Sequence, residues 1–477
     1  MRKILLVFCL LLFTSKLFAQ GYAQYNTGTL YDSFENPSQK SFTPDTSKYY
    51  AFNFLVPNFN VNVNLTGDAQ QTLKNRYINN GYTNSALQIG LGNKYNYVTA
   101  NANIYSIMFK VFGDFDGNTE LGFFTDTKMD GRGAFTDESI ALLNGSADFP
   151  GNSYSNIFNS HYSYQLYNEV GVTYREQVTK QFAIGFRIAS VSGMSAQNVK
   201  IDHSSITFDK ATDTAALRLQ GTEERAGFSK LPFSNPGLDI SIGTTYRTHD
   251  AFIIQSNLKN LGFIHWNKDA ETYDFDGETG IYDLTSSERE SNVYNAVSNG
   301  ITNGKRIEKS YNTPLDGTYE ESISKSFLIS DEETNLRYAP TLIASKELFY
   351  SDFTAVLVNP IQYNNYSLSL ITSYDSQDHF KIGSQFMIKS YNGEFFIGSN
   401  AEPQSIGLLE TGLKDKSQAM KGGAFTGEDV TFGFSLKFGP VIEHPMNAST
   451  IPMGEKGFLG KIWDKLFKPS DEKAASE

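Results

Sequence analysis

Apolar and polar residues alternate strictly along many stretches of this chain. In the clearest case the apolar positions are Val430, Phe432, Phe434, Leu436 and Phe438, with polar residues or glycine between them. Side chains of a β-strand point to opposite faces with a period of two, so the pattern predicts a strand with one apolar and one polar face. The stretch of ten residues also has the length of a tilted membrane-spanning strand.

Alternation alone also fits a soluble β-sandwich, whose strands turn their apolar faces to a core. A membrane barrel is favoured because the polar faces carry Gly, Lys and Arg that suit a lumen, and because tight hairpins at one end oppose long polar segments at the other. The predicted fold is all-β, a transmembrane antiparallel β-barrel of about 14 strands, within about 12–16. The predicted strands are 51–66, 97–112, 118–129, 164–177, 181–193, 215–228, 237–248, 251–264, 338–348, 352–360, 365–374, 379–390, 393–400 and 428–439.

Three segments interrupt this pattern. Residues 68–80 and 134–145 predict short helices, the second with Thr136 or Asp137 as N-cap and Gly145 past its end. Residues 283–335 have few strand signals and are predicted to be a long extracellular loop or a partly helical segment. The barrel itself is placed at 51–440.

Both ends of the chain carry separate signals. Arg2 and Lys3, an apolar run over 4–13 and the small residue Ala19 predict a secretory signal peptide over 1–19. After the last strand, 441–477 is predicted to be a periplasmic tail with an amphipathic helix over 457–468.

The apolar face of this tail helix has two interpretations. It either rests on the membrane surface or the barrel's own base, or it docks to a periplasmic or outer-membrane partner protein. The residues that would make the contact are Phe458, Ile462, Trp463 and Phe467.

Charge and cysteine content narrow the function classes. The formal charge of −12 becomes −15 once Arg2, Lys3 and Lys16 leave with the signal, which argues against nucleic acid or anionic lipid head groups as the main partners. The single cysteine, Cys9, lies inside the signal, so no disulfide is expected in the mature chain. Apart from the signal, no stretch approaches the roughly 18 apolar residues of a membrane helix.

The search for catalytic motifs finds no nucleophile elbow, zincin motif or P-loop, and the six histidines are scattered singly. Neither an enzyme nor a cofactor is indicated. Two segments, "DFDGNTE" and "DFDGETG", place oxygen side chains at alternate positions as a calcium loop does, but both have Thr where a bidentate carboxylate is needed. Asp-Gly is equally an ordinary turn between strands. The weak calcium candidates are Asp114, Asp116, Asn118, Asp274, Asp276 and Glu278.

The stretch "LKNLGFIHWN" (258–267) begins as a strand and then changes phase after Asn260. An extra residue or a glycine kink has this effect, because it bends the strand and redirects the side chains beyond it. The alternative is an ordinary strand end with Trp266 anchored at the membrane interface. The residues of a candidate lateral gate, or of the lumen, are Asn257, Lys259, Asn260, Gly262 and Trp266.

Several motifs together resemble an outer-membrane barrel family of Bacteroidota. They are "ENPSQKSF", "FFTDTKMDGRGAF", "LLNGSADFPG", "YNEVGVTYREQV" and "NLGFIHW", in this order. That family is similar to the long-chain fatty-acid transporter (FadL-like) barrels and, more distantly, to barrels associated with type IX secretion. The resemblance implies about fourteen strands, an N-terminal segment over 20–50 inside the lumen, and sideways release of an apolar ligand through a kinked strand.

Three functions follow as hypotheses for a protein of the cell outer membrane, with lipid as its surroundings. The first is a FadL-like channel for small hydrophobic molecules, with Asn36 and Pro37 in a lumenal plug. The second is a non-transporting accessory barrel of a secretion or assembly complex. The third is a surface-binding protein that uses residues 283–335.

Overall fold

The computed structural model describes residues 27–41, 46–112, 118–228, 234–267, 269–302, 304–329, 336–349, 353–375, 380–390, 392–400, 426–443 and 458–467. The predicted signal peptide, 1–19, lies outside these residues. Among them, no helix is long and apolar enough to cross a membrane.

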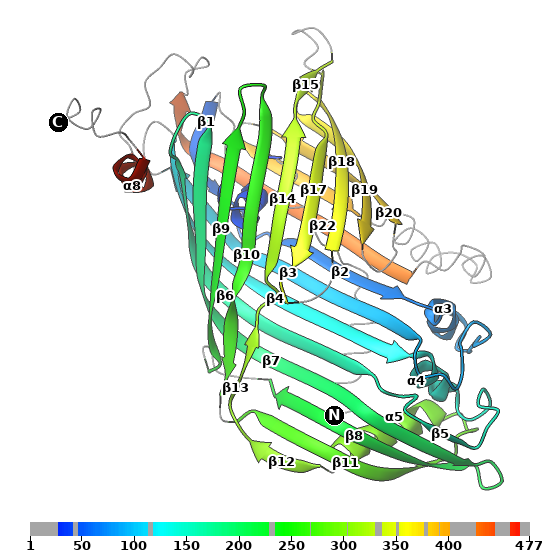
Figure 1. Ribbon diagram of the computed structural model, residues 1–477. Helices are drawn as coiled ribbons and strands as arrows, with labels where there is room; N and C mark the ends of the chain where they lie inside the picture. The colour runs from blue at the N-terminus through cyan, green and yellow to red at the C-terminus, as the bar shows by residue number, and fades with distance from the viewer. Residues whose placement is uncertain are drawn as a thin grey trace.

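Antiparallel strands close into a barrel of fourteen wall positions (Figure 1). The wall strands, in ring order, are β1 (Thr46–Phe52) with β2 (Asn58–Thr66), β3 (Tyr95–Phe112), β4 (Thr119–Thr136), β6 (His161–Gln177), β7 (Phe182–Asp209), β9 (Pro236–Arg247), β10 (Phe252–Trp266), β13 (Tyr311–Pro314) with β14 (Thr318–Lys325), β17 (Thr341–Glu347), β18 (Phe353–Tyr363), β19 (Tyr366–Asp375), β20 (Phe380–Lys389), β21 (Gly393–Ser399) and β22 (Thr426–Glu443). The ring closes because β22 pairs with both β1 and β2. The fold class predicted from the alternation is thus confirmed.

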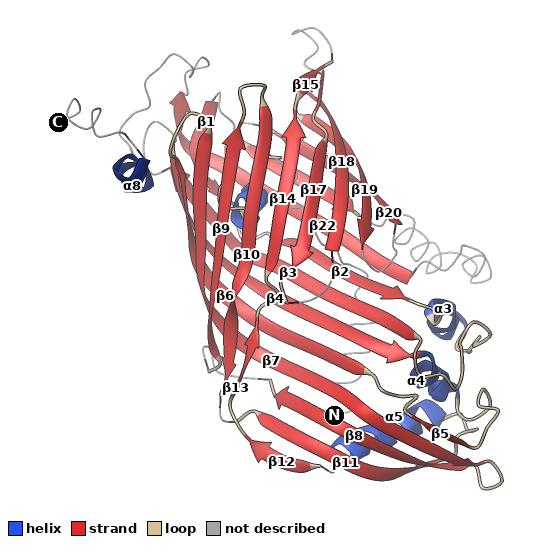
Figure 2. Cartoon of the chain, viewed as in Figure 1, coloured by secondary structure: helices blue, strands red, loops and turns tan. Residues whose placement is uncertain are grey.

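The remaining elements lie inside the barrel, at its two ends or, for the last helix, beside the outer wall (Figure 2). The further strands are β5 (Ser153–Ser155), β8 (Thr214–Ala226), β11 (Glu271–Tyr282), β12 (Lys305–Glu308), β15 (Phe327–Leu328) and β16 (Leu336–Tyr338). The helices are α2 (Leu30–Glu35), α3 (Gln70–Asn79), α4 (Asp137–Ala141) continued by η2 (Leu142–Asn144), α5 (Arg289–Thr302) and α8 (Phe458–Phe467). Both predicted loop helices are confirmed, and Thr136 is the N-cap of the second, its side chain accepting from Ser139 N.

One predicted wall strand is wrong and another was missed. Residues 215–228 were counted in the wall, but β8 pairs with the distal half of β7 and with β11, beyond the ring. Its Leu217 and Leu219 face an apolar cluster with α5 rather than lipid. Conversely, β14 lies within the supposed loop 283–335, yet it pairs with β10 and β17 as a wall strand. Glu321 on its outward face hid the alternation, and this carboxylate accepts hydrogen bonds from Ser256 and Tyr319.

The two ends of the barrel differ in their connections. The ends of β1 and β22 pair at the end with the short β6–β7 and β9–β10 turns, whereas α3, α4, α5, β8 and β11 gather at the opposite end (Figure 1). Outer-membrane barrels have short periplasmic turns and longer extracellular loops, which assigns the first end to the periplasm. Because β1 begins at Thr46 and β22 continues to Glu443, the predicted barrel limits of 51 and 440 are each several residues too narrow.

Candidate functional site in the barrel lumen

Residues 27–41, here called the plug, lie inside the barrel, where α2 is the unlabelled dark-blue helix of Figure 1. Helix α2 begins after Thr29, whose side chain accepts a hydrogen bond from Asp32 N and caps the helix. Asn36 and Pro37, the two residues predicted for a lumenal segment, are both buried here. The predicted range of 20–50 is too long, because residues 46–50 are part of β1 in the wall; residues 20–26 and 42–45 lie outside the described chain.

Aromatic side chains anchor α2 against the wall. Tyr31 packs edge-on against Tyr105 at 5.6 Å and against Phe396 at 5.8 Å between ring centroids. Phe34 packs against Phe124 at 5.6 Å. All five rings are at most 2% exposed, so α2 forms an apolar core with the lumenal faces of β3, β4 and β21.

Polar side chains of the wall bind the plug along its whole length. Carbonyl groups of the plug accept from Lys389 Nζ (Gly28 O, 2.9 Å), Lys110 Nζ (Ser33 O, 3.0 Å), Asn257 Nδ2 (Glu35 O, 2.9 Å) and Arg175 Nε (Ser38 O, 2.8 Å). At its two ends, Leu30 N donates to Glu394 and Ser41 N donates to Glu120. The wall therefore satisfies backbone groups of the plug as a strand partner would, which lets an irregular segment be buried in the lumen.

Two wall glycines make room for the plug. A Cβ on Gly185 would lie 2.1 Å from Pro37 O, and one on Gly243 would lie 2.3 Å from Asn36 Oδ1. Both glycines lie on lumenal faces of neighbouring strands, β7 and β9, where they pair with each other. The plug's turn at Asn36–Ser38 thus touches the wall backbone.

We expect Gly185→Ala to displace the plug while the strand pairing survives. The added methyl group overpacks this contact at a cost of about 1–3 kcal/mol, which lowers the occupancy of the docked plug by about tenfold or more. The measurement is the labelling rate of Ser38→Cys by a water-soluble maleimide, which should rise in the double variant. Gly227→Ala is the matched control, since its Cβ would meet nothing within 4 Å; equal rates in the two backgrounds would contradict the contact.

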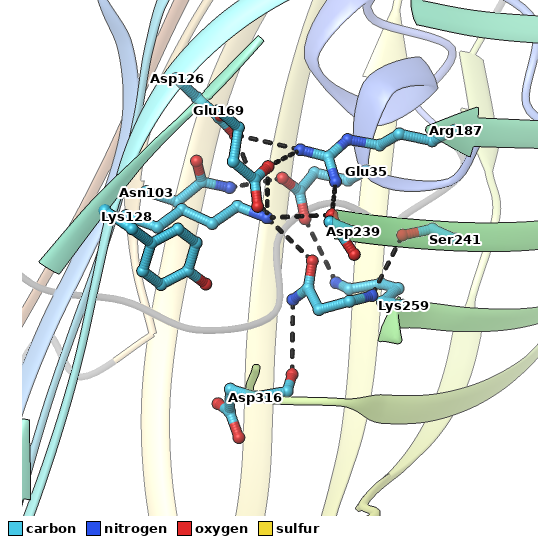
Figure 3. Close-up of polar contacts among 12 residues, drawn as sticks. Glu35, Asn103, Asp126, Lys128, Glu169, Arg187, Asp239, Ser241, Lys259 and Asp316 are labelled. Atoms are coloured by element: carbon cyan, nitrogen blue, oxygen red, sulfur yellow. Dashed lines mark hydrogen bonds and ion pairs between the residues drawn. The ribbon is translucent and has the colours of Figure 1, made fainter. Parts of the chain in front are cut away.

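Next to the C-terminal end of α2, buried charges from six wall strands and the plug form a layer (Figure 3). This charged layer comprises Glu35, Asp126, Lys128, Glu169, Arg187, Asp239, Lys259 and Glu320. Arg187 is at its centre, paired with Asp126 at 3.1 Å and with Glu169 and Asp239 at shorter range. Its guanidinium also lies 4.2 Å from the centroid of the Phe124 ring, below α2.

The two lysines of the layer hold it together: Lys259 joins the plug to the wall, and Lys128 joins wall strands to one another. Lys259 lies 3.2 Å from Glu35 of the plug and 3.2 Å from Glu320 of β14. Lys128 lies 3.2 Å from Glu169 and donates to Asn260 Oδ1 at 2.8 Å. Buried charges persist only where partners compensate for lost solvation, so plug and wall depend on each other here.

Strand β10 carries a bulge where the sequence changes phase. Between Leu258 and Leu261 two residues of β10 oppose one residue of β9, and Asn260 has a φ of 53°. Before the bulge Asn257 faces the lumen and is fully buried; beyond it Phe263 is 47% exposed on the outer face. The predicted change of faces is therefore confirmed, and a bulge is its cause.

A second irregularity lies directly across from this bulge. The partner strand is interrupted between β13 and β14, where Leu315 N still donates to Gly262 O at 3.0 Å. Asn260 fills the gap, because its N donates to Ser241 Oγ at 3.1 Å and its Nδ2 to Asp316 O at 3.4 Å. We call these two irregularities, at 259–260 and 315–317, the wall defect.

Trp266 is buried and is no interface anchor. It is 0% exposed, its Nε1 donates to Thr313 Oγ1 at 2.9 Å, and its ring lies 6.3 Å from that of Tyr311. The bulge is the physical reason, since it turns Ile264 and Trp266 inward. They join an apolar cluster on the extracellular side of the charged layer, with members Tyr167, Val191, Ala196, Ala226, Ile264, Trp266, Ala270 and Leu315.

The calcium candidates that lie in the described chain form no metal site. Asp274, Asp276 and Glu278 are exposed on one face of a regular strand, β11, rather than in a loop or turn, and Asp276 is paired with Arg218 at 2.9 Å. Asp114 and Asp116 lie outside the described residues, and Asn118 follows them. Within the described ranges no group of three metal-ligating side chains forms.

Helix α8 contacts the barrel's own wall. Leu459 N and Gly460 N donate to the carboxylate of Glu176, and Trp463 lies 5.2 Å from Phe182 between ring centroids. Of the four predicted contact residues, Phe458 and Ile462 remain exposed at 70% and 39%; the side chain of Phe467 lies outside the described set.

The sequence showed the change of phase after Asn260, and the family resemblance implied a lumenal N-terminal segment, but neither pointed to the charged layer. Asp126, Glu169, Arg187 and Asp239 are each the lumenal member of an alternating strand, and none was singled out. The sequence signal that could have found them is a charged residue on the polar face, in the middle of a strand long enough to span the membrane. The sequence does not show that four such strands bring these charges to the same height in the barrel.

The model of a family described as "Family of unknown function (DUF5723)" matches residues 41–400 of this chain. No curated protein matches the sequence.

Several solved structures are similar to the fold at low sequence identity. A deletion mutant of the monoaromatic hydrocarbon channel TodX has 9% identity and a TM-score of 0.40, with 84% of this chain and 93% of that chain covered. The Ralstonia pickettii toluene transporter TbuX has 10% identity and a TM-score of 0.40, with 88% and 99% covered. A Pseudomonas aeruginosa FadL homologue has 10% identity and a TM-score of 0.36, with 90% and 96% covered.

Proposed function

This chain belongs to the family of unknown function DUF5723, and we propose that it passes small hydrophobic molecules from the extracellular side into the outer membrane through the wall defect at 259–260 and 315–317. The observation that carries the proposal is the position of this defect. It lies at the level where the lumen changes from the apolar cluster around Trp266 to the charged layer around Arg187.

The charged layer makes an axial route costly for an apolar molecule. Such a molecule would have to separate Arg187 from its carboxylates and displace the plug, leaving buried charges without partners. For a molecule that reaches the apolar cluster at Ile264 and Trp266, the route of lowest free energy therefore runs sideways through the barrel wall. Hydrocarbon lipid lies beyond the outward-facing Phe263, and leaving water for lipid is favourable for apolar surface.

The wall is weakest at the same level. Asn260 N bonds to the side chain of Ser241 rather than to a strand partner, and Asp316 lies in the break between β13 and β14. Few main-chain hydrogen bonds must open to separate the strands at a bulge. Where β10 and β9 pair regularly, as at Asn257 opposite Gly243, the complete set of main-chain hydrogen bonds holds them together.

In the alternative function, an accessory barrel, the tail helix would be the contact surface for another protein. The first turn of α8 is instead engaged with Glu176 of this chain's own wall. The channel is therefore the function that the contacts support best.

A disulfide across the defect tests the lateral route. We expect Ser241→Cys with Asn260→Cys to abolish uptake of toluene and of a long-chain fatty acid when oxidised, and to restore it when reduced, because the crosslink holds β9 against the bulge. The only native cysteine is Cys9, so no other thiol in the mature chain interferes.

The matched control crosslinks the same two strands where they pair regularly. Thr244→Cys with Ser256→Cys joins directly opposed residues and should leave uptake unchanged in both redox states. Uptake that persists in the oxidised Ser241–Asn260 variant would overturn the lateral route, and no uptake in any state would overturn the channel.

A further inference from the structure

We propose that α8 is a membrane-surface helix, docked on the outer wall of the barrel and inserted into the phospholipid of the periplasmic leaflet. Its ligand is lipid: acyl chains for its exposed apolar residues and head-group phosphates for its lysines. This inference does not depend on what the barrel transports.

The side chain of Glu176 points outward from β6. Lumenal residues of β6 include Glu169 and Arg175, and the opposite row holds Val170, Val172 and Glu176, with Val172 56% exposed on the lipid face. Glu176 belongs to this outward row, yet it is only 1% exposed. A carboxylate on the lipid-facing side of a barrel therefore has to be covered and satisfied.

The start of α8 covers the Glu176 carboxylate. Leu459 N donates to Glu176 Oε2 at 2.8 Å and Gly460 N donates to Oε1 at 2.6 Å, while Tyr174 OH donates at 2.6 Å. These amides belong to the first turn of a ten-residue helix, whose N–H groups have no partners within the helix and whose dipole favours an anion. Glu176 thus fixes the start of α8 on the outside of the wall.

A contact between Trp463 and the wall orients the helix. Trp463 packs on Phe182, which pairs with Tyr246, an outward residue that is 41% exposed. Helix α8 lies outside the ring near the periplasmic turns (Figure 1). Its wall-facing side is therefore continuous with the lipid-facing surface of β7 and β9.

The remaining surface of α8 has the composition of an interfacial helix. Phe458 is 70% exposed and Ile462 is 39% exposed, next to the exposed Lys461 and Lys465. At the rim of a membrane barrel, apolar residues beside lysines match acyl chains next to phosphates. A protein partner would have to compete with lipid for this surface, because the barrel wall that carries it is already surrounded by lipid.

Tryptophan quenching in a bilayer tests the proposal on the full-length protein. The barrel is reconstituted in nanodiscs of phosphatidylglycerol and phosphatidylethanolamine that include lipids brominated at shallow or deep acyl positions. We expect Trp463 emission to be quenched by the shallow bromines and poorly by aqueous acrylamide. Trp463→Phe supplies the background from Trp266, the other tryptophan of the chain.

Two variants separate lipid insertion from wall docking. Phe458→Ser with Ile462→Ser should lose most of the bromolipid quenching while the contact with Glu176 remains. Glu176→Gln should release the helix from the wall and raise acrylamide quenching. Trp463 emission that acrylamide quenches and bromolipids do not would overturn the proposal and leave the helix face to a periplasmic protein.

Discussion

Replacing Arg187 by methionine is expected to destabilise the barrel by about 3–5 kcal/mol. The side chain is 2% exposed and holds Asp126, Glu169 and Asp239 together. Methionine keeps the unbranched apolar stem but carries no charge, so these carboxylates keep only Lys128 as a cation among the described residues. A buried charge that loses its partner costs far more than the pair contributes, which makes this one of the largest single-residue effects we expect.

The measurement is urea unfolding in detergent micelles, followed by the shift in gel mobility between folded and unfolded barrel. Arg218→Met is the matched control, because Arg218 forms an ion pair with Asp276 that is 57% and 48% exposed. The control should change the free energy of unfolding by about 0–1 kcal/mol. Equal effects of the two substitutions would mean that the charged layer is solvated in the folded protein.

Deleting residues 28–40 is expected to turn the barrel into an open pore. Strand pairing does not involve the plug, so the wall should still close. The deletion removes the aromatic rings of Tyr31 and Phe34 from the lumen and leaves Lys110, Lys259 and Lys389 facing water. A lumen lined by ions and filled with water conducts, as in barrels of similar width with no internal segment.

Planar-bilayer recording checks this expectation. The deletion variant should give steps of ionic conductance that are much larger than any seen for the intact chain. Truncation after Glu443 is the control, since it removes α8 from outside the wall and should leave conductance unchanged. If the deletion variant folds and conducts no better than the intact protein, the plug does not close the lumen.

Local patterns predicted individual elements well. Alternation located thirteen of the wall positions within the ranges that the structure confirms, and the phase slip after Asn260 located the bulge. The short helices α3 and α4 were predicted where the alternation is interrupted, and α4 also from its caps. These features depend on neighbours in sequence, where backbone geometry alone fixes which side chains share a face.

The sequence by itself determined that this chain forms alternating strands in a membrane barrel, with a change of face after Asn260 and an amphipathic helix at its end. Only the tertiary structure decided which strands form the wall. The apolar face of β8 packs into an apolar core at the extracellular end, whereas that of β14 faces lipid. A strand alternates with a period of two in both cases, so the pattern does not tell a protein core from lipid. The structure alone also placed Arg187 beside three carboxylates from three other strands, because register between strands sets their heights, and register is a property of pairs.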